Sequence, residues 1–285
     1  MHHNAHISPF RYPGGKGSLA PQLATAIRAV NVHAYVEPFA GGAAAAWKLL
    51  HWGVVDRVVL NDLDPRIYAA WRSILFDTER FLERLESVKA TIEEWRRCEA
   101  IVRDAKSDDL FELGFATFFL NRTNRSGIIL GAAPIGGYQQ LGHWKLDARL
   151  PRDTLAERIK WIGTQRDRVD LTNVDAGAAI ERATKLHGPS GAFYLIDPPY
   201  VGAGSRLYLN TMNDEDHARL ERCISASKIR YWMLTYDRSP LIEKLYARRH
   251  VARQEIDYSL SRRRKEAELM ILPLGLSRKL DRASS

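Results

Sequence analysis

Amphipathic and apolar segments alternate near the start of the chain. The pattern predicts a helix over residues 18–30, a short strand over 34–36 and an Ala-rich helix that ends near Trp52. A second strand is expected over residues 57–60, and it leads directly into Asn61-Asp62. This first part of the chain therefore has the strand and helix order of an α/β protein.

The same alternation returns after residue 168. We expect strands over 169–172, 192–196 and 230–234, helices over 176–186 and 214–226, a short helix after Pro240, and β-type runs near 251–256 and 268–272. Such alternation predicts an α/β fold with a mainly parallel sheet and helices on both faces. In these sheets ligands bind beyond the carboxyl ends of the strands, so we expect the loops that follow the strands to form the active site.

The middle of the chain has a different pattern. From residue 65 to residue 120 it is helical without a strand signal, and residues 110–120 are apolar on most sides, which predicts a buried helix. Residues 121–145 contain three basic residues, no acidic residue and five glycines, which is typical of an ordered functional loop. We therefore predict a core domain formed by residues 1–64 and 166–285, with a mainly helical insertion at 65–165.

Composition narrows the class of protein. The chain has 285 residues and 45% hydrophobic content, enough for a large folded domain, and no apolar run reaches the roughly 18–20 residues of a membrane-spanning helix. Cys98 and Cys223 lie far apart without neighbours at ligand spacing, so we expect no disulfide, no metal site and a reducing, cytoplasmic setting. The net charge of +8 favours polyanionic partners without identifying one.

A glycine-containing turn stands where the first strand passes into a helix. In Glu37-Pro38-Phe39-Ala40-Gly41-Gly42 the glycines let the backbone approach a ligand, and the helix start offers free amide donors. The turn lacks the fingerprints of dinucleotide-binding and phosphate-binding loops, and taken alone it is equally typical of a structural turn. Asp62, at the end of the next strand, adds a carboxylate that can accept both hydroxyls of a ribose.

A second motif, Asp197-Pro198-Pro199-Tyr200, follows the apolar strand at 192–196. Two prolines stiffen the turn and remove two amide donors, which leaves the Asp197 carboxylate and the Pro198 carbonyl as acceptors beside an aromatic ring. Acceptors next to a stacking face suit a planar base with an exocyclic amine. A turn that only caps a buried strand is the alternative.

Five motifs occur in a fixed order along the chain. They are Phe10-Arg11-Tyr12-Pro13-Gly14-Gly15-Lys16, Glu37-Pro38-Phe39-Ala40-Gly41-Gly42, Asn61-Asp62, Phe119-Leu120-Asn121-Arg122 and Asp197-Pro198-Pro199-Tyr200. In this order they closely resemble the Dam-like family of adenine-specific DNA methyltransferases of bacteria and phages. The resemblance spans nearly the whole chain, and it implies a Rossmann-like, S-adenosylmethionine-dependent methyltransferase sheet with an inserted, helical target-recognition domain.

The resemblance also implies a reaction and the residues for it. The cofactor would be S-adenosylmethionine, and its methyl group would pass to the N6 amine of adenine in double-stranded DNA, with the target base flipped out of the helix. The catalytic residues would be Asp197, Pro198, Pro199 and Tyr200. The residues in contact with the cofactor would be Tyr12, Lys16, Glu37, Pro38, Phe39, Gly41, Asp62 and Asp197. Among them, Asp62 would hold the ribose, and Tyr12 replaces a tryptophan of some members.

The loop after residue 120 would face DNA. The resemblance and the basic character of the loop together assign DNA contacts to Asn121, Arg122, Asn124, Arg125 and Lys145. The arginine-rich segment 248–265 is either a second phosphate contact or a solvated face. The strand end Thr235-Tyr236-Asp237 is a candidate wall of the target-base pocket.

Other functions stay open at the level of sequence. The acceptor is either adenine or another exocyclic amine, in cytosine or in RNA; Asp197 in place of serine favours adenine in families of this kind. A catalytically silent DNA-binding module is the alternative from another class, and the complete set Tyr12, Lys16, Asp62 and Asp197 argues against it. GATC is only a candidate recognition sequence, host, phage and restriction–modification roles are equally compatible, and we expect a monomer.

Overall fold

The computed structural model describes residues 7–12, 14–105, 109–201, 211–258 and 264–283. The strands are β1 (Ala34–Glu37), β2 (Arg57–Asn61), β3 (Val169–Thr172), β4 (Ala192–Ile196), β5 (Tyr231–Asp237), β6 (His250–Tyr258) and β7 (Arg264–Leu272). The α-helices are α1 (Ala20–Val30), α2 (Ala44–His51), α3 (Pro65–Phe76), α4 (Thr78–Ser87), α5 (Ile92–Asp104), α6 (Leu110–Thr123), α7 (Arg152–Gly163), α8 (Ala176–His187), α9 (Asp214–Ala226), α10 (Pro240–Leu245) and α11 (Leu274–Ala283). Short 3₁₀ turns are η1 (Lys16–Ser18), η2 (Arg125–Gly127), η3 (Leu146–Arg149) and η4 (Arg166–Arg168).

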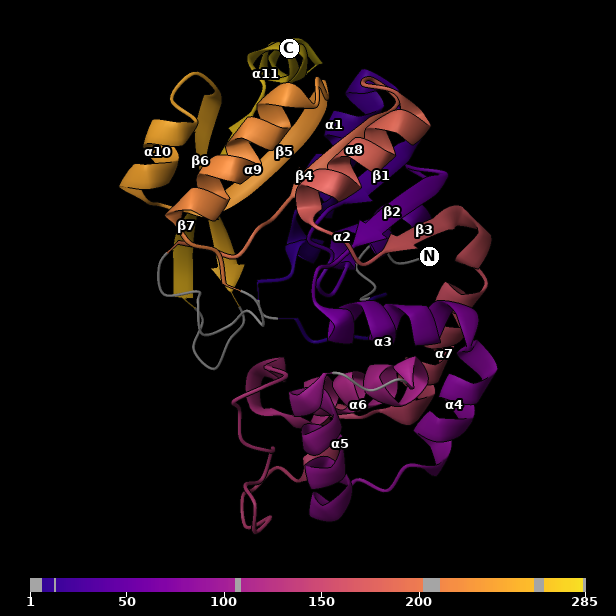
Figure 1. Ribbon diagram of the computed structural model, residues 1–285. Helices are drawn as coiled ribbons and strands as arrows, with labels where there is room; N and C mark the ends of the chain where they lie inside the picture. The colour runs from indigo at the N-terminus through magenta and orange to yellow at the C-terminus, as the bar shows by residue number, and fades with distance from the viewer. Residues whose placement is uncertain (1–6, 13, 106–108, 202–210, 259–263, 284–285) are drawn as a thin grey trace.

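One sheet organises the two ends of the chain. Within the described ranges seven strands lie in the order β3-β2-β1-β4-β5-β7-β6 (Figure 1). The pairs among β1 to β5 are parallel, whereas β7 is antiparallel to both β5 and β6. The predicted Rossmann-like α/β fold is thereby confirmed. Chain order reverses between β1 and β4, and in such sheets this position opens a crevice for ligands.

Helices cover both faces of the sheet, because neighbouring residues of a strand point to opposite sides. Tyr35 of β1 and Phe193 of β4 pack in a core with the α1 and α2 side chains, whereas Val36 and Tyr194 pack in a second core with α8, α9 and α10. Figure 1 shows α8, α9 and α10 in front of the sheet and α1 behind it. Strands buried on both faces read as unbroken apolar runs, which is why β4 is fully apolar.

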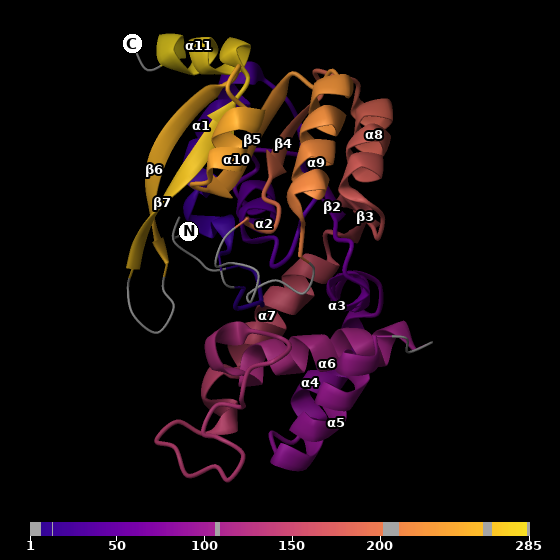
Figure 2. The ribbon, with the colours of Figure 1, turned by 60° about the vertical axis from the view of Figure 1, so that its left-hand side comes forward.

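The helices α3 to α7 gather at the end of the sheet where its parallel strands stop (Figure 2). Helix α6 is buried almost throughout, as its sequence predicts. A Cβ added at Gly114 would lie 2.4 Å from the Ala69 carbonyl oxygen of α3, so this glycine lets the two helices meet closely. The rings of Trp47 on α2 and Trp71 on α3 lie 5.3 Å apart, which joins these helices to one sheet face in a continuous core. The division of the chain into two domains stays a prediction.

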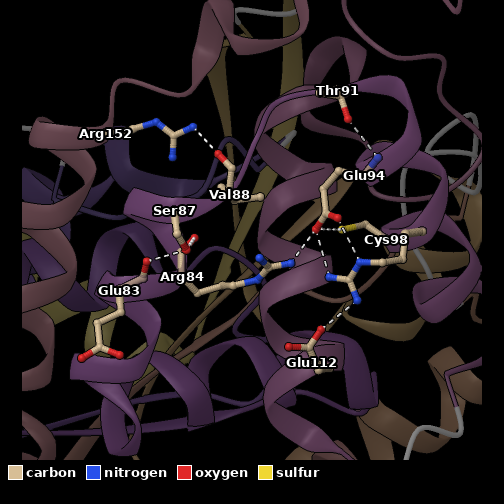
Figure 3. A network of polar contacts seen from close by, with 10 residues as sticks. Glu83, Arg84, Ser87, Val88, Thr91, Glu94, Cys98, Glu112 and Arg152 are labelled. Atoms are coloured by element: carbon tan, nitrogen blue, oxygen red, sulfur yellow. Dashed lines mark hydrogen bonds and ion pairs between the residues drawn. The ribbon is translucent and has the colours of Figure 1, made fainter.

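Ion pairs connect the helices of this part on their outer side (Figure 3). Glu94 of α5 accepts from Arg84 of α4 at 2.8 Å and from Arg97 at 2.9 Å, and Arg97 also reaches Glu112 of α6 at 3.0 Å. These side chains remain partly exposed, so each pair contributes about 1 kcal/mol or less. The network therefore links α4, α5 and α6 on the surface and contributes little to the stability of the fold.

Several boundaries differ from the sequence-based expectation. Helix α6 continues to Thr123, past the predicted loop start, and β5 runs on to Asp237. The antiparallel strands β6 and β7 are longer than expected, and the pattern did not single out α7 or α11. No helix in the described part of the chain is long and apolar enough to cross a bilayer.

Candidate active site

A cavity of about 240 Å³ opens at the carboxyl ends of the parallel strands. Its wall is built from the loops after β1, β2, β3 and β4, together with the segment before α1 and with α9. All eight residues predicted to hold a cofactor line it: Tyr12, Lys16, Glu37, Pro38, Phe39, Gly41, Asp62 and Asp197. The structure thus brings together residues from four separate stretches of sequence.

The Tyr12 ring closes one side of the cavity. A Cβ added at Gly41 or at Gly42 would lie 2.7 Å from an atom of the Tyr12 side chain. Gly41 also has φ of 45°, a backbone conformation that glycine adopts without strain. The glycines after β1 therefore allow the Tyr12 side chain to pack closely against the turn.

Asp62 lies directly after β2 and is held by the backbone. Its carboxylate accepts hydrogen bonds from the amides of Gly41, at 2.8 Å, and Asp64, at 3.0 Å. Loss of contact with water raises the pKa of Asp62 to about 7, although these two amides act in the opposite direction. One amide bonds each oxygen, so each oxygen keeps a lone pair that can accept from a ligand.

Glu37, at the end of β1, is buried behind the turn. It accepts from the Tyr35 hydroxyl at 3.0 Å and from the Ala46 amide of α2 at 3.2 Å. Burial raises the pKa of Glu37 to about 8, and these two hydrogen bonds offset part of that effect. At neutral pH Glu37 therefore presents a mainly protonated carboxyl to the cavity.

Asp197 follows β4 and is surrounded by three polar partners. Its Oδ2 lies 3.1 Å from the Lys16 ammonium, while its Oδ1 accepts from the Thr235 hydroxyl at 2.5 Å and from the Tyr200 hydroxyl at 3.3 Å. Thr235 comes from β5, next to β4 in the sheet. Pro199 lines the cavity, and Pro198 is buried beside it. Three elements thus hold the Asp197 carboxylate in place.

Two acidic residues of this region were not singled out from the sequence. Glu268 on β7 is 2% exposed, lies 3.3 Å from Lys16 and accepts a short hydrogen bond from the Tyr200 hydroxyl. Asp175 follows β3, accepts from the Gly177 amide at 2.9 Å, and lines the cavity. Sequence signals could have identified both residues. Glu268 is a carboxylate inside a strand with apolar residues, and Asp175, like Asp62, is an acid that follows a strand.

Three of the residues predicted to contact DNA direct their side chains into the protein. Asn121, Arg122 and Asn124 are buried, and their side chains bond to the protein interior. Asn121 donates to the carbonyls of Arg11 and Gly127, and Arg122 donates to those of Pro9 and Arg149. Burial, followed by the charges of neighbouring arginines, lowers the pKa of Arg122 to about 9. These residues hold the N-terminal segment and the loop together, and their contact with DNA stays a prediction.

The exposed side chains lie further along the loop. Arg125 and Lys145 are exposed, as are Tyr138, Leu141 and Trp144, whose exposed fractions are 53%, 80% and 63%. The loop projects away from the sheet in Figures 1 and 2. Arg262 and Arg263 of the C-terminal arginine-rich segment lie outside the described residues.

Comparison with known proteins places these features in one family. Residues 12–260 match the model of the D12 class N6 adenine-specific DNA methyltransferases. The chain belongs to this family. The match covers all eight predicted cofactor residues that line the cavity, and it agrees with the resemblance drawn from the motifs.

Two individual proteins are similar over part or most of the chain. The type II methyltransferase M.MjaIII of Methanocaldococcus jannaschii is 28% identical over 137 residues, which are 43% of this chain and 47% of that protein. The alignment thus spans about half the length of this curated relative. An rRNA methyltransferase of Streptomyces viridochromogenes superposes with a TM-score of 0.38 at 15% identity, covering 93% of this chain and 87% of that chain.

Proposed function

We propose that this chain transfers the methyl group of S-adenosylmethionine to the N6 amine of adenine in duplex DNA. The observation that carries the proposal is that Asp197 lines the same cavity as Asp62 and Lys16. An acceptor for the target amine therefore stands within reach of a cofactor held by the loops after β1 and β2. Membership of the D12 family supplies the substrate class.

The cavity residues fit S-adenosylmethionine. Asp62 keeps a lone pair on each carboxylate oxygen, which suits the two ribose hydroxyls. Leu63, with 53% of its surface exposed, offers an apolar face to the adenine ring, and Asp175 offers a nearby acceptor. When bound, the cofactor would supply a methyl group on a sulfonium, and the carbon–sulfur bond would break as the methyl bonds to the amine nitrogen.

The residues around Asp197 would hold the target base. A paired adenine presents its amine to its partner, so the base must leave the duplex at a cost of a few kcal/mol. The Asp197 carboxylate and the Pro198 carbonyl would accept the two amine hydrogens, and the Tyr200 ring would stack on the base. Asp197 then stabilises the positive charge that develops on nitrogen and takes up the released proton or passes it to water.

DNA would be held by basic residues of the loop after α6. The chain has a net charge of +8, and Arg125 and Lys145 are exposed on the loop after α6. Contacts of this kind with phosphates supply affinity and leave the choice of sequence to other side chains. The exposed Tyr138, Leu141 and Trp144 of the same loop are available for base contacts.

The product nucleoside tests this proposal. Purified protein is incubated with methyl-labelled S-adenosylmethionine and either duplex DNA or RNA, and the digested nucleosides are separated. We expect label in N6-methyladenine from DNA. Label in N4-methylcytosine or in RNA would show that the protein methylates another amine. If no nucleoside is labelled, the chain would instead be a silent DNA-binding module.

A further inference from the structure

Two carboxylates, the partly buried Asp197 and the buried Glu268, share the same two partners in the active site. The Lys16 ammonium lies 3.1 Å from Asp197 Oδ2 and 3.3 Å from Glu268 Oε1. The Tyr200 hydroxyl lies near both acids as well, at 3.3 Å from Asp197 Oδ1 and still closer to Glu268 Oε1. Lys16 is 5% exposed and Glu268 is 2% exposed, so water competes little for these contacts.

This arrangement conflicts with the role proposed for Asp197. Lys16, Thr235 and Tyr200 already occupy its carboxylate oxygens. An incoming amine must take over part of that bonding capacity. The amine nitrogen also becomes positively charged during methyl transfer, so an ammonium group bound to Asp197 would oppose the reaction electrostatically. Lys16 and Tyr200 must therefore move away from Asp197 when the base arrives, while each keeps its contact with Glu268.

We propose that Glu268 is a positioning residue that holds Lys16 and Tyr200 while the Asp197 carboxylate turns to the target amine. The inference rests on the proposed function. Glu268 does not touch the base; it keeps the Lys16 ammonium and the Tyr200 hydroxyl from returning to Asp197. It also fixes the Tyr200 ring, which would stack on the base.

The second oxygen of Glu268 supports this role. Glu268 Oε2 is buried and has no hydrogen-bond partner among the described residues. A buried carboxylate oxygen without a donor is costly, and Oε2 offers a place for a donor released from Asp197. Both Lys16 and Tyr200 already contact the neighbouring oxygen of the same carboxylate. A small movement therefore brings either donor to Oε2.

The electrostatic surroundings make Glu268 sensitive to protonation. Burial raises the pKa of Glu268, the Asp197 charge raises it further, and Lys16 and the Tyr200 hydrogen bond act in the opposite direction. On the adjacent strand, Asp237 of β5 lies opposite Glu268 in the register. A protonated Glu268 holds Lys16 less strongly, so methyl transfer should slow as pH falls through the raised pKa.

The test compares E268Q with E268D in the full-length protein. E268Q keeps the size and removes the charge, and we expect it to lower the single-turnover methyl-transfer rate about tenfold to a hundredfold. The KM values for cofactor and DNA should stay within about threefold, because Glu268 acts after binding. E268D retains a carboxylate and should recover part of the rate. E112Q, in the ion-pair network of α5 and α6, serves as the matched Glu-to-Gln control and should leave the rate unchanged.

The pH profile separates positioning from a structural role. With cofactor and DNA both saturating, the wild-type rate should fall on the acid side, E268D should keep this fall, and E268Q should show a smaller fall because glutamine does not titrate. Y200F removes the shared hydroxyl, and its effect should be less than additive with that of E268Q. A wild-type rate in E268Q, or a lowered rate with the acid fall unchanged, overturns the inference. Wild-type protein that forms no N6-methyladenine contradicts the proposed function instead.

Discussion

The strand-end cavity and the loop after α6 both contain residues of the sequence motifs, but they use them differently. At the cavity, Tyr12, Lys16, Asp62 and Asp197 line the space in which the chemistry is proposed. At the loop, Asn121, Arg122 and Asn124 point into the protein and bond to backbone carbonyls. A motif can therefore mark a scaffold as readily as a ligand contact, and the presence of a cavity beside the side chain distinguishes the two.

The largest expected effect on methyl transfer comes from a substitution of Asp197, which lies in the cavity. D197A removes the proposed acceptor of the amine and should lower methyl transfer by about a thousandfold or more. Binding of S-adenosylmethionine and DNA, measured by calorimetry and by fluorescence anisotropy, should stay within about threefold. D167A, at an exposed position in η4, is the matched control. Near-normal turnover in D197A would refute its catalytic role.

Asp62 is expected to have the next largest effect. D62N weakens acceptance of the ribose hydroxyls and should reduce cofactor affinity about tenfold to a hundredfold. Because the pKa of Asp62 is raised to about 7 and the ionised form accepts both hydroxyls, wild-type affinity should increase as pH rises from 6 to 8. Calorimetry at both pH values should show this increase in wild type and none in D62N. Equal slopes in the two proteins would place the titrating group elsewhere.

The loop side is tested by comparing exposed with buried residues. Neutralising the exposed pair in R125Q/K145Q should reduce the slope of log affinity for DNA against log salt by up to about 1.8, since each phosphate that a basic side chain neutralises adds about 0.9 to that slope. N121A should leave the slope unchanged and instead lower the free energy of unfolding by about 2–4 kcal/mol, because it leaves buried backbone groups unpaired. A changed slope in N121A would show that Asn121 contributes to DNA binding.

The smallest effect on methyl transfer is expected from the buried Glu37, whose prediction concerns stability. Its pKa is about 8 in the folded protein and close to the ordinary value for glutamate in the unfolded chain. The folded state therefore binds more protons between these values, and the free energy of unfolding should fall as pH rises through this window. Denaturant unfolding at pH 5 and pH 8 should show a loss of about 3 kcal/mol that E37Q lacks. A loss of the same size in E37Q would show that groups other than Glu37 cause the pH dependence.

The sequence predicted the elements with strong periodicity and the residues at strand ends. Strands β1 to β4 and helices α8 and α9 follow directly from apolar runs and amphipathic spacing. Asp62 and Asp197 were identifiable because an acid directly after a buried strand must lie at the ligand edge of a parallel sheet.

The sequence could not predict features that depend on contacts between distant segments. Glu268 joins Lys16 and Tyr200 only because β7 inserts between β5 and β6, and no local pattern specifies that strand order. Similarly, Arg122 is a basic residue in a basic stretch, and only the folded chain shows that the carbonyls of Pro9 and Arg149 enclose it. Local spacing gives the face of an element, and tertiary packing decides what covers that face.

The most direct test of the central claim reads the modified bases of a genome. The intact chain and D197A are each expressed in a bacterial host that lacks adenine methylation, and the genomic DNA is sequenced with detection of modified bases. We predict N6-methyladenine at one short recurring sequence with the intact chain and none with D197A. Genomic DNA without methylated adenine, or methylation that persists with D197A, would contradict the account.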